Sequence, residues 1–483
     1  MKIIENTTRW LGLVLACGIV TYAASAQTVE HETQKLLASD GVAQDLFGWS
    51  ISISGDRAIV GSSHADAAYM FERVSGVWTE VAKLTASHGI PGVAFGTTVS
   101  VSGDTAVVGA RDPYDNTVYG GAAHVYERIG GVWTEVAKLT ARDEASGNSG
   151  PSVSVSGDRI IVGAQYDEEN GYDSGAAYVY ERIGRVWTKV AKLTASGGSH
   201  RFGNSVSVSG DYALVGTDLG PASYVYERIG GVWTEVATLT AGAVTSGIIG
   251  QHVSVSGGRA IVGASGDDGN GDNSGAAYVY ERLDGVWTEV ARLTASDAAA
   301  GDVFGWSVTL SGDHAIVGAY GDSASGTYSG SAYLFERIRG VWTEVVRLTA
   351  SDAAASDAFG FSVSVSGDHA IVGALGDDDS GFSSGSAYVY GLHTILFNDI
   401  EFLIAHVVLL NLQQGIANSL VAMLGPAVNA LGDINYHDDV AAKGSLQAFI
   451  TAVSAQQGKF ISQADGDALI AEAQAIIDRL NVE

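Results

Sequence analysis

The residues of this chain best suited to chemistry are carboxylates gathered in short glycine-rich segments. In one of these, Asp268, Asn270 and Asp272 alternate with glycine, as oxygen ligands do at the start of a calcium-binding loop. The bidentate carboxylate that such loops require at a later position is not evident. Two interpretations therefore stay open for this segment: a calcium site, or a solvated acidic loop stabilised by its own turns.

Similar acidic segments recur, and we predict that together they form a surface that binds a partner. The carboxylates in question are those of Asp167, Glu168, Glu169, Asp267, Asp268, Asp272, Asp322, Asp377, Asp378 and Asp379. Motifs for catalysis are not found beside them. The 11 histidines are scattered, and there is no Gly-x-Ser-x-Gly elbow leading from a strand into a helix, no histidine pair with metal spacing and no phosphate-binding glycine loop. We predict no catalytic residue and a protein that is not an enzyme.

The acidic segments belong to a sequence that is repeated seven times. A Phe-Gly-like pair opens each copy, every 47 to 55 residues, at Phe47, Phe95, Ser149, Phe202, Ile249, Phe304 and Phe359. Repeats of this length are typical of propellers and solenoids. Within a copy, alternation of apolar and small residues predicts four short strands, joined by Gly-Asp and Gly-Gly turns.

The two ends of the repeat region are complementary. The seventh copy stops at Tyr390 without a fourth strand, whereas residues 34–40 match the end of one. A closed ring explains this arrangement, because closure removes an exposed sheet edge. We therefore predict a mainly β protein: a seven-bladed β-propeller of four-stranded antiparallel blades over residues 31–390, closed by the N-terminal strand.

The repeats resemble the FG-GAP repeats of integrin α-chain propellers and their secreted bacterial relatives. The resemblance rests on the Phe-Gly pair, on Val-Gly-Ala as in Val262-Gly263-Ala264, and on the Gly-Ala-Ala-Tyr-Val-Tyr segment that follows. It implies the propeller fold. Calcium-binding members of the family hold the ion in an Asp-rich insertion between the first two strands of a blade. Here that connection is a minimal hairpin, as in Ser54-Gly55-Asp56, so the family's calcium site is not expected.

The connections of each blade fall on two faces of the ring, because antiparallel strands alternate in direction. Those after the first and third strands are short and nearly identical in all copies, whereas those after the second and fourth strands vary. Loops on a rigid scaffold commonly carry function. The variable face, which contains the acidic segments, is therefore the predicted recognition surface. The tryptophan of each outer strand is predicted to pack between blades.

After Tyr390 the composition changes to Ala, Leu, Ile and Gln. Apolar spacing near 3.6 predicts a small helical bundle over residues 391–483. Its expected helices span residues 399–412, 416–431, 439–456 and 464–480. The segment resembles the FIMAH module found at the C-termini of secreted bacterial proteins, with matches at residues 402–406, 415–419 and 446–450.

Residues 1–26 are typical of a secretory signal peptide. An apolar stretch over residues 10–20 follows Lys2 and Arg9, and Ala24-Ser25-Ala26 offers a cleavage site. We expect a bacterial protein that is secreted or held at the cell surface after cleavage near Ala26. The stretch is too short to span a bilayer. Cys17, the single cysteine, lies within it in a poor lipidation context, so a lipid anchor is not expected.

The net charge of −28, from 26 basic and 54 acidic residues, makes nucleic acid and anionic membranes unfavourable partners. These patterns predict an exported recognition or adhesion protein that binds a protein or a glycan through its acidic face. Two alternatives remain open. One is a lyase or hydrolase of extracellular polysaccharide, with a non-repeating polar cluster at the propeller axis. The other is a structural component of a secreted or cell-surface assembly, docked through the helical module.

Overall fold

The computed structural model describes most of the chain between Val29 and Leu480. The described residues are 29–30, 32–87, 92–112, 120–140, 152–197, 201–218, 220, 222–241, 249–338, 340–392, 400, 403–404, 406–408, 410, 412–431 and 439–480. The predicted signal peptide, with Cys17 and the cleavage site at Ala26, lies outside the described residues.

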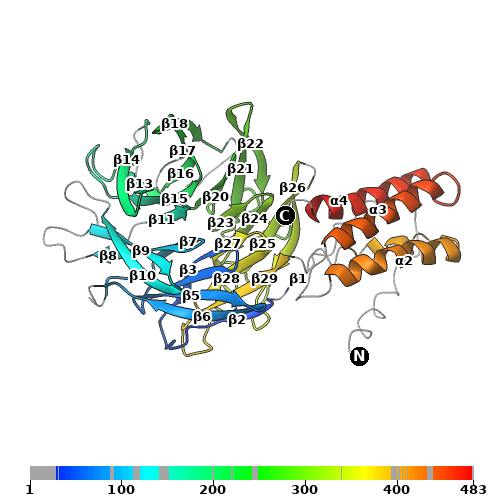
Figure 1. Cartoon of the computed structure of the whole chain (residues 1–483), viewed down its shortest axis with the longest axis horizontal. Helices are drawn as coiled ribbons and strands as arrows, with labels where there is room; N and C mark the ends of the chain where they lie inside the picture. The colour runs from blue at the N-terminus through cyan, green and yellow to red at the C-terminus, as the bar shows by residue number, and fades with distance from the viewer. Residues whose placement is uncertain are drawn as a thin grey trace.

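Seven antiparallel sheets form a β-propeller (Figure 1), and the predicted fold class is confirmed. Blade 1 contains β3 (Phe47–Ser54), β4 (Arg57–Ser62), β5 (Ala67–Val74) and β6 (Val77–Leu84). Blade 2 contains β7 (Thr98–Ser102), β8 (Thr105–Asp112), β9 (Gly120–Ile129) and β10 (Val132–Thr140). Blade 3 contains β11 (Val153–Ser156), β12 (Arg159–Ala164), β13 (Ala176–Ile183) and β14 (Val186–Leu193). Blade 4 contains β15 (Phe202–Ser209), β16 (Tyr212–Thr217), β17 (Ser223–Ile229) and β18 (Val232–Leu239).

The remaining blades follow the same order. Blade 5 contains β19 (Val253–Ser256), β20 (Arg259–Ala264), β21 (Ala276–Leu283) and β22 (Val286–Leu293). Blade 6 contains β23 (Ser307–Ser311), β24 (His314–Ala319), β25 (Ser331–Ile338) and β26 (Val341–Leu348). Blade 7 contains β27 (Phe359–Ser366), β28 (His369–Ala374), β29 (Ser386–Gly391) and, from the other end of the chain, β2 (Gln34–Leu36).

Blade 7 is thus completed by the start of the chain, in the pairing that the repeat pattern predicts. β2 runs antiparallel to β29, with Gln34 opposite Val389 and Leu36 opposite Ala387. A second N-terminal strand, β1 (Val29–Glu30), was not predicted. It pairs in parallel with β26 and adds a fifth strand to blade 6. A strand of two residues is too short to show the alternation of apolar and polar residues by which the other strands were predicted.

In the described residues, a pair of glycines meets at six of the seven junctions between blades. The glycine of Val-Gly-Ala in one blade lies against the glycine of Phe-Gly in the next. A Cβ atom on Gly373 of blade 7 would lie 2.3 Å from the carbonyl oxygen of Gly48 in blade 1. The same contact joins Gly61 to Gly96, Gly163 to Gly203, Gly216 to Gly250, Gly263 to Gly305 and Gly318 to Gly360. Main chains this close leave no room for a side chain at either position.

Serine hydroxyls complete the junctions along the innermost strands. Ser52 Oγ accepts a hydrogen bond from the Val101 amide at 3.1 Å, and Ser364 Oγ accepts one from the Ile53 amide across the closing junction, also at 3.1 Å. Each innermost strand is a sheet edge, and its buried amides need a partner outside the sheet. The alternating serines of the inner strands therefore supply hydrogen-bond acceptors for the edge amides of the next blade.

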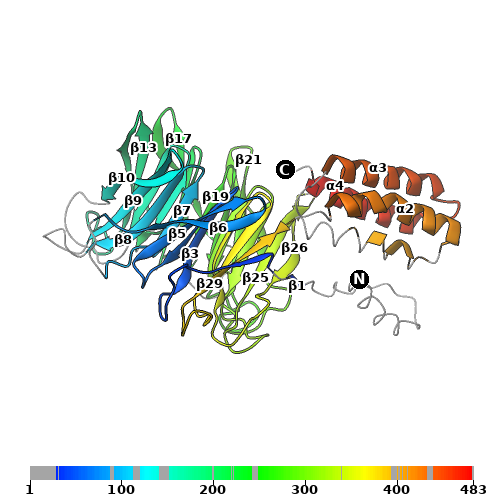
Figure 2. The same cartoon turned by 60° about the horizontal axis from the view of Figure 1, so that its bottom comes forward.

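The helices beside the propeller (Figures 1 and 2) begin within two residues of their predicted starts. They are α2 (Gln414–Leu431), α3 (Asp439–Gln456) and α4 (Gln463–Leu480). Leu424, Leu446, Phe449 and Leu469 are among the side chains of their shared core. The expected helix over residues 399–412 falls partly outside the described residues. In the described part of the chain, no helix is both long enough and apolar enough to cross a bilayer.

Replacing Gly318 with alanine tests the glycine contact. The new Cβ would lie 2.0 Å from the carbonyl oxygen of Gly360, so we expect a loss of about 3 kcal/mol in the free energy of unfolding. Gly312→Ala is the control: it has a φ of +59° but nothing within 4 Å, so only about 1 kcal/mol of backbone strain is expected. Urea unfolding measures both. Equal losses would contradict close packing as the reason for the glycine.

Candidate functional site

The loops between the second and third strands are organised by their first aspartate. Asp267 Oδ2 accepts a hydrogen bond from the Tyr278 hydroxyl at 2.8 Å. Its Oδ1 accepts bonds from the Gly269 amide at 2.8 Å and from Arg292 Nη2 at 2.7 Å. Burial opposes ionisation, but the bonds from Arg292, Tyr278 and Gly269 hold the pKa of Asp267 below its usual range. The carboxylate thus ties the loop to the third and fourth strands of its own blade.

The equivalent aspartates of blades 3, 6 and 7 repeat this arrangement. Asp167, Asp322 and Asp377 each lie within hydrogen-bond distance of a tyrosine of the third strand and of a cation from the outer strand. Asp267, Asp322 and Asp377 are only 2%, 5% and 4% exposed. These three point into the blade and organise the loop from below, and their contact with a partner stays a prediction.

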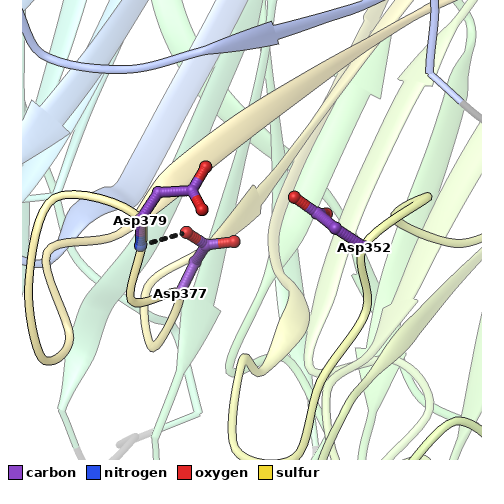
Figure 3. A group of neighbouring side chains, drawn as sticks. All are labelled: Asp352, Asp377 and Asp379. Atoms are coloured by element: carbon purple, nitrogen blue, oxygen red, sulfur yellow. Dashed lines mark hydrogen bonds between the residues drawn. The ribbon is translucent and has the colours of Figure 1, made fainter.

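Blade 7 has the densest group of carboxylates, formed by Asp352, Asp377 and Asp379 (Figure 3). In the described ranges, this is the one set of three or more metal-type side chains whose ligand atoms all lie within 4.8 Å of one another. Lys35 Nζ, from the N-terminal strand, lies 2.7, 2.9 and 2.6 Å from their oxygens. Burial disfavours its charge, yet hydrogen bonds to Asp352, Asp379 and Asp377 raise the pKa of Lys35 above its usual range.

The Lys35 ammonium therefore supplies the positive charge that a metal ion would otherwise bring to these carboxylates. Asp352, Asp377 and Asp379 near the end of the propeller chain form ion pairs with Lys35 near its beginning. The cluster therefore helps to close the ring. We interpret it as a structural ion-pair group and not as a metal centre.

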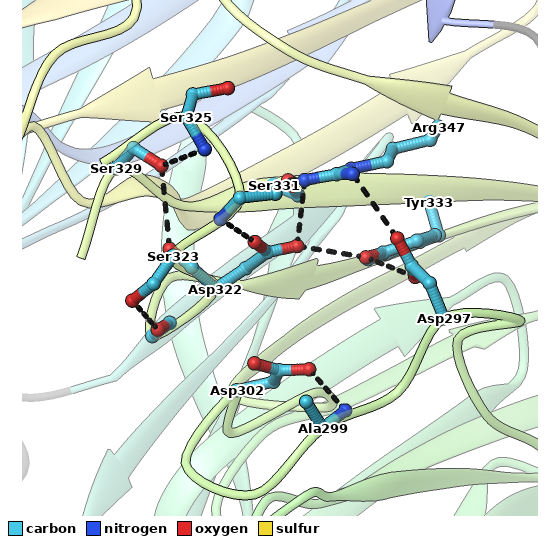
Figure 4. Close-up of polar contacts among 12 residues, drawn as sticks. Asp297, Ala299, Asp302, Asp322, Ser323, Ser325, Ser329, Ser331, Tyr333 and Arg347 are labelled. Carbon is cyan, nitrogen blue, oxygen red and sulfur yellow. Dashed lines mark hydrogen bonds and ion pairs between the residues drawn. The ribbon is translucent and has the colours of Figure 1, made fainter. Parts of the chain in front are cut away.

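Blade 6 shows the same plan with arginine in place of lysine (Figure 4). Arg347 donates to Asp297 Oδ2 at 3.1 Å and to Asp322 Oδ2 at 2.9 Å. The Tyr333 hydroxyl lies 2.8 Å from Asp297 Oδ1 and 3.0 Å from Asp322 Oδ2. Asp297 follows the outer strand of blade 5, so this network joins one blade to the next. Burial, with the nearby charges of Asp322 and Asp297, raises the pKa of Asp302 beside it.

The other predicted site residues lie nearer the surface. Glu168, Glu169, Asp272, Asp378 and Asp379 are exposed, and Asp167 and Asp268 are half-buried. In the predicted calcium segment, Asp268 Oδ1 accepts a hydrogen bond from the Asn273 amide at 2.7 Å, while Asn270 is exposed. The loop backbone thus engages one of the proposed ligand oxygens, and calcium at this segment stays a prediction.

Three aromatic side chains at the tips of the same loops were missed by the sequence analysis. Tyr172, Phe382 and Tyr328 are 83%, 69% and 55% exposed. The loop backbones accept hydrogen bonds from the start of the next blade: Phe382 O from the Gln44 amide at 2.8 Å, and Tyr328 O from the Ala358 amide at 3.0 Å. Next to Tyr172, Asp173 O accepts the Arg201 amide at 2.7 Å. The sequence does contain an indication of these tips: an aromatic residue within a short loop of Asp, Ser and Gly has few apolar neighbours to be buried against.

The chain belongs to the FG-GAP repeat family. The family model, described as FG-GAP repeat, matches residues 31–71, 78–126, 133–180, 187–225, 233–280, 287–335 and 342–390. From the second match onward, each begins in the outer strand of one blade and ends in the third strand of the next. The sequence unit is therefore offset from the structural blade by one strand, which is what leaves β2 to complete blade 7.

Solved structures resemble the propeller only distantly. A functionally unknown protein from Desulfotomaculum acetoxidans DSM 771 is 12% identical, with a TM-score of 0.41 over 64% of this chain and 90% of that one. A protein from Bacteroides uniformis ATCC 8492, provisionally described as a 6-phosphogluconolactonase, is 13% identical, with a TM-score of 0.45 over 67% and 90%. A search of curated proteins finds no significant match. At these scores the likenesses say nothing about what this chain binds or catalyses.

Lys35→Met tests the closing ion-pair group. The substitution leaves the buried Asp377 and the more exposed Asp352 and Asp379 without their shared cation, so we expect a loss of about 2–3 kcal/mol in the free energy of unfolding. The control is Lys83→Met at the equivalent position of blade 1, where the lysine pairs with the exposed Asp40 and should contribute at most about 1 kcal/mol. Similar losses in the two variants would show that the cluster does not stabilise closure.

The buried Asp357 predicts a pH dependence. Burial, together with the charges of Asp377 and Asp352, raises the pKa of Asp357 to about 6, from about 4 in an unfolded chain. The folded state therefore retains this proton more strongly, so the group's contribution to stability falls as the pH rises through that interval. Asp357→Asn should be more stable than the native chain by about 2 kcal/mol above pH 7, and this difference should vanish near pH 4.

Thermal unfolding between pH 4 and pH 8 measures the effect of Asp357→Asn. Asp45→Asn is the matched control, because Asp45 accepts the same type of loop amide, that of Val42, but is only half-buried beside the exposed Asp40. A gain for Asp357→Asn that is independent of pH would show that its carboxyl titrates normally.

Proposed function

We propose that this protein is an exported, non-enzymatic recognition or adhesion protein that binds a protein or a glycan partner through the loop face of its propeller. The observation that carries the proposal is the set of exposed aromatic tips, Tyr172, Tyr328 and Phe382, held on rigid loops. Aromatic residues are enriched where proteins bind partners, because they bury a large area with little loss of side-chain freedom. Exposed carboxylates lie in two of the same loops, Glu168 and Glu169 with Tyr172, and Asp378 and Asp379 with Phe382.

The anchoring of the loops supports the proposal. The loop of each tip contains an aspartate, buried in blades 6 and 7 and half-buried in blade 3, that is bonded to a tyrosine and to a cation of its blade. A loop that is ordered before binding loses less conformational entropy when a partner arrives. Secretion, a bacterial origin, the closer likeness to integrin α-chain propellers and a FIMAH-like role for the C-terminal helices belong to the same proposal, and they rest on the sequence patterns.

The test compares two sets of three substitutions in the full chain. One set truncates the tips, Tyr172→Ser, Tyr328→Ser and Phe382→Ser. The matched control truncates exposed aliphatic residues on the outer strands, Val132→Ser, Val186→Ser and Val232→Ser. Binding is measured on an array of glycans and on an array of immobilised extracellular proteins, with and without a chelator.

We expect the native chain and the outer-strand variant to bind the same targets, and the tip variant to bind them at least tenfold more weakly with an unchanged melting temperature. A chelator effect would favour calcium at Asp268, Asn270 and Asp272. Full binding by the tip variant would contradict the assignment of the loop face.

A further inference from the structure

One position at the start of the inner strands varies between blades, although its neighbours in the repeat hardly vary. It directly follows the Phe-Gly pair, and in the described ranges it holds Trp49, Thr97, Asn204, Gln251, Trp306 and Phe361. The inner strands β3, β7, β11, β15, β19, β23 and β27 contact one another in a closed ring, so the position recurs around the propeller axis. It lies at the loop face, because the Phe359 amide beside it bonds to Ser329 O of a loop at 3.0 Å.

In blades 6, 7 and 1 this position is aromatic, and the rings touch. The centroid of Phe361 lies 5.7 Å from that of Trp306 and 5.2 Å from that of Trp49. Tyr320, at the end of β24, lies 5.0 Å from Trp306 and 5.6 Å from Phe361. All four side chains are half-buried, unlike the fully buried phenylalanine of Phe-Gly in these blades. They form an arc of aromatic rings that remains partly open to solvent.

The strand geometry explains why these rings do not enter the core. The pairing register between β3 and β4 shifts between Phe47 and Ser50, and the register between β27 and β28 shifts between Phe359 and Ser362. Irregularities of this kind interrupt the alternation of side chains and redirect one residue. Trp49 and Phe361 occupy the redirected positions.

Blades 4 and 5 continue the arc with polar side chains. Asp218 accepts hydrogen bonds from Gln251 Nε2 at 3.1 Å and from Arg201 Nη1 at 2.6 Å, and Asn204 Nδ2 donates to Gln251 O at 3.1 Å. These four side chains are half-buried. The ring of His252 lies 5.6 Å from that of Trp306 and links the two parts. Burial lowers the pKa of His252 to about 4, so the link is uncharged at neutral pH.

We propose that this axial arc is a binding site for a neutral oligosaccharide. A pyranose ring has an apolar C–H face that fits against an aromatic ring, and a rim of hydroxyl groups that needs amide, carboxylate and guanidinium partners. The arc presents both kinds of surface side by side, the combination expected of a small-molecule site. The net charge of −28 disfavours acidic saccharides. The proposal goes beyond the loop-face function, since it uses none of Tyr172, Tyr328 and Phe382.

The test titrates the full chain with soluble neutral hexasaccharides of β-linked glucose, mannose, xylose and N-acetylglucosamine. Binding is followed by calorimetry and by tryptophan fluorescence, because Trp49 and Trp306 would report contact directly. We expect at least one hexasaccharide to bind and to change the fluorescence. Phe361→Leu and Gln251→Ala should each weaken that binding at least tenfold. Phe361→Leu keeps an apolar side chain, and a melting curve shows whether either variant still folds.

The control is Tyr172→Ala, which removes an exposed ring from a loop tip and should leave saccharide binding unchanged. Absence of binding by every hexasaccharide would overturn the proposal, as would equal affinity of the native chain and a folded Phe361→Leu variant. Saccharide binding that persists in the triple tip variant would support the axial site even if the loop tips bind no partner.

Discussion

The ring depends on the close approach of two main chains where blades join, and at six of the seven junctions the described residues place a glycine of one blade against a glycine of the next. Seven sheets can close around an axis only if their inner edges come close together, and any side chain at these two positions would hold them apart. The serine hydroxyls then provide the hydrogen bonds that such close edges need. One steric requirement therefore accounts for the two most regular motifs of the sequence.

Because these contacts set the scaffold, other positions of the repeat are free to differ. The loop tips and the residue after Phe-Gly take no part in the glycine contact, and these are the positions where Tyr172, Phe382, Trp49 and Trp306 occur. Charge is divided in a similar way. The first aspartate of a loop is paired with a cation of its blade, while the carboxylates that follow it lie nearer the surface.

Periodicity and repetition were enough to predict the seven blades, the use of residues 34–36 to complete the last one, and the starts of the three C-terminal helices. The outer-strand tryptophans were predicted to pack, and those such as Trp78 and Trp342 are indeed buried. The fate of individual aspartates could not be predicted in this way. Asp267 and Asp268 are adjacent in sequence, yet only the first is placed beside Tyr278 and Arg292.

The axial arc was missed for a related reason. Its members are spread over residues 49 to 361, and only ring closure brings Trp49 of blade 1 next to Phe361 of blade 7. A comparison of the repeats position by position would have marked the site, because Trp, Asn and Gln replace one another where the neighbouring residues stay the same. That their side chains lie close together could be known only from the folded structure.

The order of synthesis separates β2 from its pairing partner in time. β2 is made before any of the inner strands, and its partner β29 is made only after the first six blades. Until then, Leu36 lacks its packing partners in blade 7 and Lys35 lacks the carboxylates that pair with it. The ring therefore closes only after β29 has been made, and until it closes a second copy of the chain could pair with β29 in place of β2.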